Sequence, residues 1–387
     1  MNLFKEKIWP KTKDVFKASY KKMQPSLIAV GIGVFIGFIL MLIFNPGGAF
    51  PGLIRMILGG FNGGIKGLGD VLLHATPIIL TGVALVVAFK TGLFNIGASG
   101  QMILGAYVAV HIGVLWNLPP VIHWLVALIL GTLAGMIWGI IPGVLKAFYN
   151  TNEVVVSIMM NYIGTFLVIY LVKSNVLNFA YAKSKNIVAS AALPRFGNLF
   201  GNSSVNIGII IAILCAIGIH ILFKKTTLGY QLQASGFNRD ASRYAGMNAK
   251  KNIVTAMAIS GSLAGLAGAI MYLVPGTNLD TSFYILPGGF DGISVALLGL
   301  GEPLGALFAG LFLAHIRQGG FFMQINGFVP QIIDMIIAAI VYVTAISAGI
   351  QIYLQHLKNK RQEKKAEVTE NDWYNSIIIR FHYSTIN

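Results

Sequence analysis

Polar side chains interrupt an otherwise apolar stretch in the first third of the sequence. Residues 91–105 read TGLFNIGASGQMILG and place Asn95, Ser99 and Gln101 among glycines. Amide and hydroxyl groups inside a membrane need hydrogen-bond partners or water. Two interpretations follow: these side chains line the path of a polar solute, or they join neighbouring helices that the glycines allow to approach closely.

Ser99 also admits a catalytic interpretation. The sequence GASG resembles the way in which intramembrane serine proteases of the rhomboid type present their nucleophile. Such a serine needs a neighbouring base, and the candidates are His111, His123 and His220. The sequence places none of these histidines to meet Ser99, so the hydrolase remains a third alternative.

A second polar position lies in the stretch TNEVVVSIMMNYIG. Thr151 or Asn152 would cap a helix here, and Glu153 suits the first turn because of the helix dipole. Glu153 therefore has a structural interpretation. Asn161 follows eight residues later on nearly the same face, where an amide would either contact a polar solute or pair two helices.

A carboxylate opens another apolar stretch, GGFDGISVALLGLGEPLG, at residues 288–305. Asp291 would cost about 2.5–3.5 kcal/mol at the centre of a membrane helix unless it is wet or paired. It is either part of a solute pathway, together with Ser294, or an N-cap at the outer interface. The order of residue types resembles that of 91–105, as an inverted repeat with its binding site between the halves would require.

Several kinds of chemistry are absent from the sequence. No GxxxxGK[ST] phosphate loop is present, so the chain has no ATPase site of this type, and no HExxH supports a metalloprotease. Cys215 is the only cysteine, which excludes an intrachain disulfide and a cysteine-cluster metal site. We expect no metal and no cofactor in this chain.

The composition predicts an all-α polytopic membrane protein. The 387 residues are 56% hydrophobic and 11% charged, with a mean hydropathy of +0.73, which is too apolar for a soluble domain. A membrane helix needs about 20 apolar residues, and the eighth of the ten candidates is too short to cross unaided, as in a broken helix. The candidates are 26–44, 71–89, 94–116, 121–145, 154–172, 206–223, 252–274, 290–301, 304–318 and 329–352.

The basic residues predict the orientation in the cell membrane. With both termini in the cytoplasm, 21 of the 28 Lys and Arg residues lie inside, as the positive-inside rule requires. The net charge of +15 is explained in this way, and we expect no nucleic acid partner. The predicted domains are a basic cytoplasmic N-terminus (1–25), a transmembrane domain (26–352) and a cytoplasmic tail (353–387).

Three further segments lie outside the predicted spans. The Gly-rich residues 45–69 and the residues 173–205 are expected on the outer side, where they cap helices or meet a delivery protein. The last fifteen residues, 373–387, change character abruptly, and we have no physical account of them.

The longest polar interruption, residues 224–251, lies on the predicted cytoplasmic side. Asn238 would cap a short helix near 239–245, Asp240 suits its first turn, and Gly246 offers a left-handed stop.

The two faces of this short helix differ. Arg239 and Arg243 share one stripe, and Ala241 and Ala245 share another. The segment is either a docking surface for a partner or a solvated connection between two membrane helices.

Four motifs in order carry a resemblance to a known family. TGLFNIGASGQMILGA, TNEVVVSIMMNYI, LGYQLQASGFNRDASRYAGMNAKKNIVTAMAISGSLAGLAGAI and GGFDGISVALLG resemble the permease subunits of ABC importers of the ribose and branched-chain amino acid class. They are closest to the nucleoside-importing branch that works with basic-membrane-protein lipoproteins. The likeness covers about residues 26–352.

The resemblance implies a type II importer permease with ten helices, which carries nucleosides and pairs with a second, similar permease. It also implies an ABC ATPase with two nucleotide-binding domains, which holds ATP and Mg²⁺, and a substrate-binding lipoprotein outside. A permease of the same fold for a sugar or another small polar solute, and a secondary transporter driven by an ion gradient, are the alternatives. The coupling helix of the family maps onto Gly236, Phe237, Asn238, Arg239, Asp240, Ala241, Arg243 and Tyr244.

Overall fold

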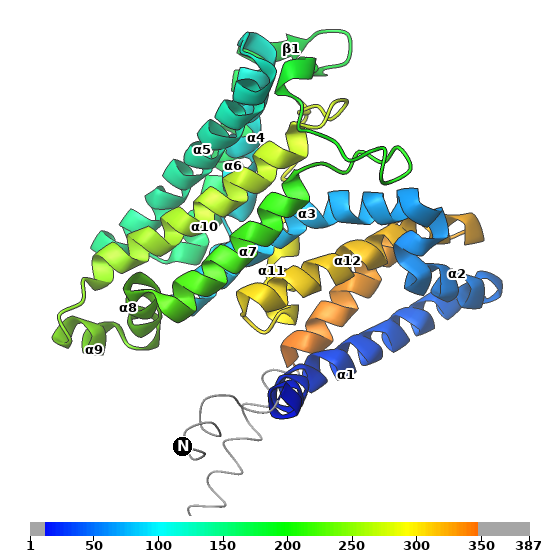
Figure 1. The fold of residues 1–387 in the computed structure, drawn as a ribbon, viewed down its shortest axis with the longest axis horizontal. Helices are drawn as coiled ribbons and strands as arrows, with labels where there is room; N and C mark the ends of the chain where they lie inside the picture. Colours follow the sequence, from blue (N-terminus) through cyan, green and yellow to red (C-terminus); the bar gives the residue numbers. More distant parts are fainter. Residues whose placement is uncertain (1–11, 347–387) are drawn as a thin grey trace, which may run out of the picture.

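The computed structural model describes residues 12–346, and these fold almost entirely into helices (Figure 1). The described part does not include residues 1–11, the end of the tenth predicted span, the predicted tail or the last fifteen residues. The helices are α1 (Thr12–Phe44), α2 (Pro46–Leu58), α3 (Gly64–Lys90), α4 (Ala98–Leu115), α5 (Pro120–Tyr149), α6 (Glu153–Leu171), α7 (Gly208–Lys225), α8 (Thr227–Phe237), α9 (Arg239–Tyr244), α10 (Ala249–Tyr272), α11 (Gly288–Leu298) and α12 (Pro303–Met323). A further apolar helix follows at Gln331–Ile346.

Within the described residues, each predicted apolar segment contains a helix. In the described residues, seven helical runs are long and apolar enough to cross a membrane, and shorter apolar helices lie at Ile28–Phe44, Gly288–Leu298 and Gln331–Ile346. At 1.5 Å per residue, the eleven residues of α11 span about 16 Å of a core about 30 Å thick. The polytopic helical architecture is therefore confirmed, and the eighth predicted segment is too short to cross, as expected.

Two segments that the sequence analysis treated as connections are helical. Residues 46–58 form α2, because Asn45 accepts a hydrogen bond from the Gly48 amide and Pro46 suits a first turn. Residues 227–237 form α8, which Thr226 caps through the Gly229 amide. The polar segment 224–251 thus contains two short helices, α8 and α9, rather than one.

Glycines let three helices pack backbone against backbone. A Cβ added at Gly135 of α5 would lie 2.5 Å from the Cα of Gly265 on α10, and one at Gly265 would lie 2.7 Å from the Cα of Gly135. Gly105 of α4 faces the same backbone. Small residues at facing positions let membrane helices approach closely, although no hydrophobic driving force brings them together. Helix α3 contacts α7, α10, α11 and α12, so it joins this group to the rest of the molecule.

The segment between α10 and α11 is not helical, and the loop of residues 173–205 fixes its first part. Strands β1 (Leu177–Asn178) and β2 (Lys183–Ser184) pair antiparallel. The Asn278 amide donates to the Ser184 carbonyl at 2.9 Å, and the Leu279 amide donates to the Ser184 hydroxyl at 3.0 Å. Hydrogen bonds from the backbone and the hydroxyl of Ser282 hold the pKa of Asp280 below its usual value. This loop lies at the opposite end of the molecule from α8 and α9 (Figure 1).

The glycine contact predicts a sharp contrast between two substitutions. Gly265→Leu should lower the midpoint of thermal unfolding of the detergent-purified protein, because overpacking costs about 1–3 kcal/mol and the opposing atoms here are backbone. Gly218→Leu is the matched control, since a Cβ at Gly218 of α7 meets nothing within 4 Å. Equal midpoints for the two variants would contradict the packing argument.

Candidate functional site

The short helix α9 has the caps that its sequence predicts. The Asn238 side chain accepts from the amides of Asp240 and Ala241, each at 3.0 Å. Gly246 has a φ of +81°, which ends the helix in the left-handed region. The helix ends at Tyr244, one residue before the predicted end. Local sequence therefore determines this element.

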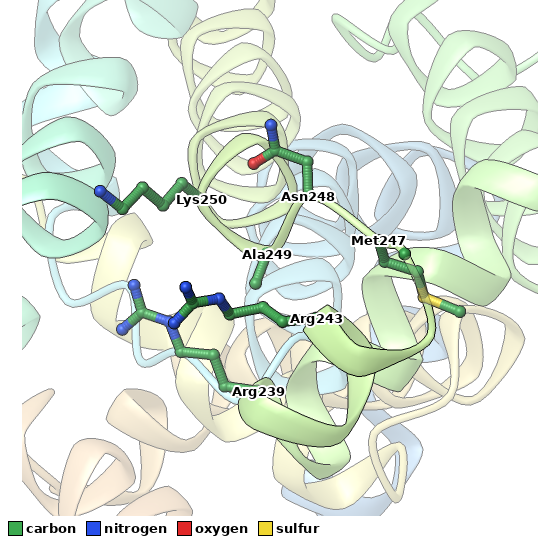
Figure 2. Close-up of a pocket in the computed structure, with 7 residues that line it drawn as sticks. Arg239, Arg243, Met247, Asn248, Ala249 and Lys250 are labelled. Carbon is green, nitrogen blue, oxygen red and sulfur yellow. The ribbon is translucent and has the colours of Figure 1, made fainter.

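The two stripes of α9 face two different hollows. Arg239 and Arg243 line one of about 380 Å³ with Lys250, and Figure 2 shows the two guanidinium groups close together. Ala241 and Ala245 line a second hollow of about 460 Å³ between α8 and α9, beside Phe237.

Large apolar side chains stand out beside these hollows. Phe237 is 90% exposed and Tyr244 is 94% exposed. Exposed aromatic groups next to a basic hollow are typical of a protein-binding surface. Residues 236–244 with Lys250 are called the docking surface below.

The basic side chains of the docking surface are not equivalent. Arg239 donates to the Ala147 carbonyl at 3.2 Å, so it also satisfies the C-terminal end of α5. The Lys250 ammonium lies 5.0 Å from the centre of the Phe148 ring. Arg243 is exposed, and it is the cation whose removal least disturbs the contacts within the chain.

The docking surface and the helix α8 that precedes it are tied to the long helices at two points. The Asn252 amide on α10 donates to the Ser235 hydroxyl at 2.7 Å and to the Gln231 carbonyl at 3.2 Å. A Cβ at Gly236 would lie 2.6 Å from the carbonyl carbon of Thr91, just after α3. Helices α8 and α9 are therefore in direct contact with α10 and with the end of α3.

An ion pair extends this connection to the second half of the chain. The Lys90 ammonium at the end of α3 lies 2.8 Å from the Glu302 carboxylate, in the turn between α11 and α12. The turn after α3 thus touches the docking surface on one side and the α11–α12 turn on the other.

The polar residues of the stretch 91–105 form a buried hydrogen-bonded cluster. Asn95 donates to Gln101 at 2.9 Å and to Ser260 at 2.8 Å, and Ser260 donates in turn to the Ala84 carbonyl at 2.7 Å. Asn95, Gln101 and Ser260 are buried. The structure brings α3, α4 and α10 together through these groups, which favours the helix-pairing interpretation.

Asn161 plays the same part for α6. Its amide donates to the Ile96 carbonyl at 3.0 Å, and its oxygen accepts from the Gly100 amide at 2.8 Å. It therefore satisfies backbone groups at the non-helical entry to α4. Contact of Asn161 with a solute stays a prediction, and its hydrogen-bonding groups are occupied by the protein here.

Ser99 does not fit the hydrolase alternative. It is buried, and its hydroxyl donates to the Leu286 carbonyl at 2.8 Å rather than to an imidazole. His111 bonds to Tyr107, and His123 bonds to Ser190 and the Ile112 carbonyl. Ser99 instead joins the start of α4 to Leu286, just before α11, and it also packs against Gly289 in the first turn of α11, where an added Cβ would clash with it.

Asp291 is paired in a way that the sequence analysis did not predict. Arg317 on α12 donates to both of its carboxylate oxygens, at 2.7 and 3.0 Å. A second carboxylate, Asp334, lies 3.8 Å from Arg317. Asp291 is the fourth residue of α11 and makes no cap, so the N-cap interpretation is wrong. Ser294 follows one turn later and is half-buried.

A sequence signal for this pair was present. Arg317 lies inside the predicted ninth span and Asp334 inside the tenth, and charges within spans rarely stay unpaired. The partner of each charge could not be chosen from the sequence, because the pair joins residues 26 positions apart on different helices. Within residues 12–346, no three His, Cys, Asp or Glu side chains gather as metal ligands.

Comparison with known proteins assigns the family. The model of the branched-chain amino acid transport system / permease component family matches residues 67–346. The chain belongs to this permease family. No solved structure matches.

Three curated relatives show how far the likeness extends. The permease is 40% identical to the guanosine ABC transporter permease protein NupP of Bacillus subtilis over 337 residues, which is 86% of this chain and 96% of that protein. It is 34% identical to the nucleoside ABC transporter permease protein NupB of Lactococcus lactis over 90% of this chain and 98% of that protein. It is 30% identical to the glucose ABC transporter permease protein TsgB13 of Haloferax volcanii over 73% of this chain and 76% of that protein.

The charge pair predicts non-additive effects on stability. Arg317→Met should lower the thermal unfolding midpoint more than Asp291→Asn, because it leaves two carboxylates without their cation. The cost should fall below the about 3–5 kcal/mol of a fully buried pair, since 34% of the Arg317 side chain is exposed.

The double variant Asp291→Asn with Arg317→Met removes both charges and should recover part of the loss. Midpoints measured for the three purified variants decide this point. If the double variant loses as much as the sum of the single variants, the pair does not stabilise the permease in the way described.

Proposed function

We propose that this chain is the transmembrane permease subunit of an ATP-driven importer that carries nucleosides into the cell. The observation that carries the proposal is the likeness to NupP and NupB over nearly their whole length. The name of the Haloferax relative makes a sugar the second candidate, with lower identity and coverage. In either case the permease makes and breaks no bond.

The docking surface is proposed as the site where the ATPase binds. Gly236, Phe237, Asn238, Arg239, Asp240, Ala241, Arg243 and Tyr244 would form the coupling contact. The exposed aromatic rings, the basic hollow and the attachment to α3 and α10 support this role. When two ATP-binding domains close, the displaced docking surface would tilt these helices and change access to the pathway.

The remaining partners follow the same proposal. A second permease would complete the pathway, a double ATPase would hold ATP and Mg²⁺, and a substrate-binding lipoprotein would meet the outer loops. Ten spans, with both termini in the cytoplasm, form an inverted repeat of five helices each. The meeting of the starts of α4 and α11, each preceded by non-helical backbone, supports this symmetry.

The solute pathway is proposed to run along the face of Asp291 and Ser294. These two residues lie three apart on α11 and are only half-buried. Asn95, Ser99, Gln101 and Asn161 would form the wall behind it, with their hydrogen bonds holding the helices that enclose the path.

Reversing one charge of the docking surface tests the coupling role. Arg243→Glu should reduce copurification of the ATPase and ATP-dependent uptake at least tenfold, because an acidic partner would then face a like charge. Arg243→Lys keeps the charge and should retain most of both.

The matched control for charge is Lys183→Glu with Lys185→Glu, which reverses two exposed charges on the opposite side of the molecule. ATPase copurification should be unaffected in this control. If Arg243→Glu binds the ATPase as wild type does, the docking surface has another role.

Uptake by the purified complex tests the cargo. Proteoliposomes with the second permease, the ATPase and the lipoprotein should accumulate labelled guanosine or another nucleoside when ATP is supplied, and unlabelled nucleosides should compete. Accumulation of glucose without nucleoside competition would establish the second candidate instead.

A further inference from the structure

Three aromatic rings stack on the surface of the molecule outside the polar cluster and the docking surface. The Phe283 ring lies 4.9 Å from the Phe166 ring and 5.9 Å from the Tyr162 ring, measured between centres, with interplanar angles of 25° and 9°. Each residue is about half exposed: Tyr162 46%, Phe166 57% and Phe283 48%. The rings therefore present an open, nearly parallel aromatic surface, called the aromatic stack below.

The aromatic stack lies deep in the membrane rather than at its surface. Helix α6 begins at Glu153, which pairs with Lys146 at 2.9 Å on the proposed cytoplasmic side. At 1.5 Å per residue, Tyr162 and Phe166 lie about 14 and 20 Å along this helix. Aromatic residues that anchor a helix to the headgroups lie at the two ends of a core about 30 Å thick. The stack is at middle depth, so anchoring does not explain it.

The backbone that carries Phe283 is incompatible with a lipid-facing surface. Helix α10 ends at Tyr272 and α11 begins at Gly288, and Ser282, Phe283 and Tyr284 between them are non-helical and exposed. This segment runs from the β1–β2 hairpin, where the Thr281 hydroxyl donates to the Ala182 carbonyl, to the start of α4, where Ser99 donates to the Leu286 carbonyl. Phe283 and Tyr284 lie between these two levels. Non-helical backbone inside the core occurs only where protein buries it or where it lines a water-filled cavity. Since these residues are exposed, the face that they form lines water or is covered by a partner.

Charged groups lie near this segment. Tyr284, next to Phe283 in sequence, lies within electrostatic reach of Arg317, which holds Asp291. The Asp334 side chain is 72% exposed, and an exposed carboxylate within a span is costly against lipid. Aromatic rings beside charged and hydrogen-bonding groups form a surface suited to a solute with a flat ring and polar substituents.

We propose that Tyr162, Phe166 and Phe283 form a platform on which the base of the transported nucleoside stacks as it passes through the permease. The proposal rests on the function proposed above and adds the residues that recognise the base. Base–aromatic stacking tolerates different bases, because every base has a flat face. The platform should therefore favour purine and pyrimidine nucleosides alike over sugars of similar polarity.

The test replaces the ring without removing its bulk. In the reconstituted importer, with saturating loaded lipoprotein, Phe283→Leu should lower the nucleoside uptake rate roughly tenfold, the lower part of the range that loss of one stacking contact gives. Phe283→Tyr should stay within about twofold of wild type. Tyr162→Leu with Phe166→Leu should match Phe283→Leu, because these rings complete the platform.

A control variant and two further measurements distinguish a loss of base recognition from a loss of folding or assembly. Tyr170→Leu is the control, because Tyr170 is an exposed ring on α6 outside the stack, and its uptake should be normal. Basal ATP hydrolysis and copurification of the second permease should be unchanged in all variants.

Three outcomes would overturn the platform. Normal uptake in Phe283→Leu and in the double variant would show that the rings face lipid. Loss of the second permease together with uptake would show that they pack a subunit interface. If wild type imports no nucleoside at all, the proposed function fails first and the platform fails with it.

Discussion

The absence of water in the hydrocarbon core is the constraint on which the rest of the structure depends. Backbone groups outside a helix must find partners in the protein or line a wet cavity, and this permease leaves the helical conformation twice at depth. Residues 93–97 are buried or half-buried, and Asn95 and Asn161 bond to the Gly97 amide and the Ile96 carbonyl. Residues 282–284 are exposed. The first interruption is therefore packed within the protein, and the second is exposed and borders the proposed solute path.

The proposed docking surface is in close contact with the long helices of the permease. Gly236 packs against the backbone just after α3, and Asn252 of α10 is hydrogen-bonded to Ser235 of α8. These contacts restrict relative movement between the docking surface and the helices α3 and α10. The Lys90–Glu302 pair brings the α11–α12 turn into the same assembly. Closely packed interfaces switch between discrete arrangements rather than deform gradually, so a displaced docking surface is expected to move whole helices.

The sequence predicted what depends on local physics. Hydropathy located the apolar helices, and Asn238 and Gly246 located α9, because caps act on adjacent residues. The helices α2 and α8 were missed, since glycines and polar residues there weaken the usual signals. The partners of Asp291 and Phe283 could not be predicted, because ion pairs and ring stacks between distant segments depend on tertiary packing. The same limit left the roles of Asn95 and Asn161 open until their buried hydrogen bonds were seen.

Reactivity of a cysteine at Tyr284 tests most directly whether the exposed interruption faces water, because Tyr284 is 55% exposed and lies beyond the part of the segment that the β1–β2 hairpin holds. The experiment uses the assembled importer in vesicles of both orientations, a Cys215→Ala background that removes the only native thiol, and a charged reagent that cannot cross lipid. Tyr284→Cys should react from at least one side and be slowed by nucleoside, whereas Ile217→Cys, exposed on the apolar helix α7, should stay unreactive. A Tyr284→Cys variant as inert as Ile217→Cys from both sides would contradict the account.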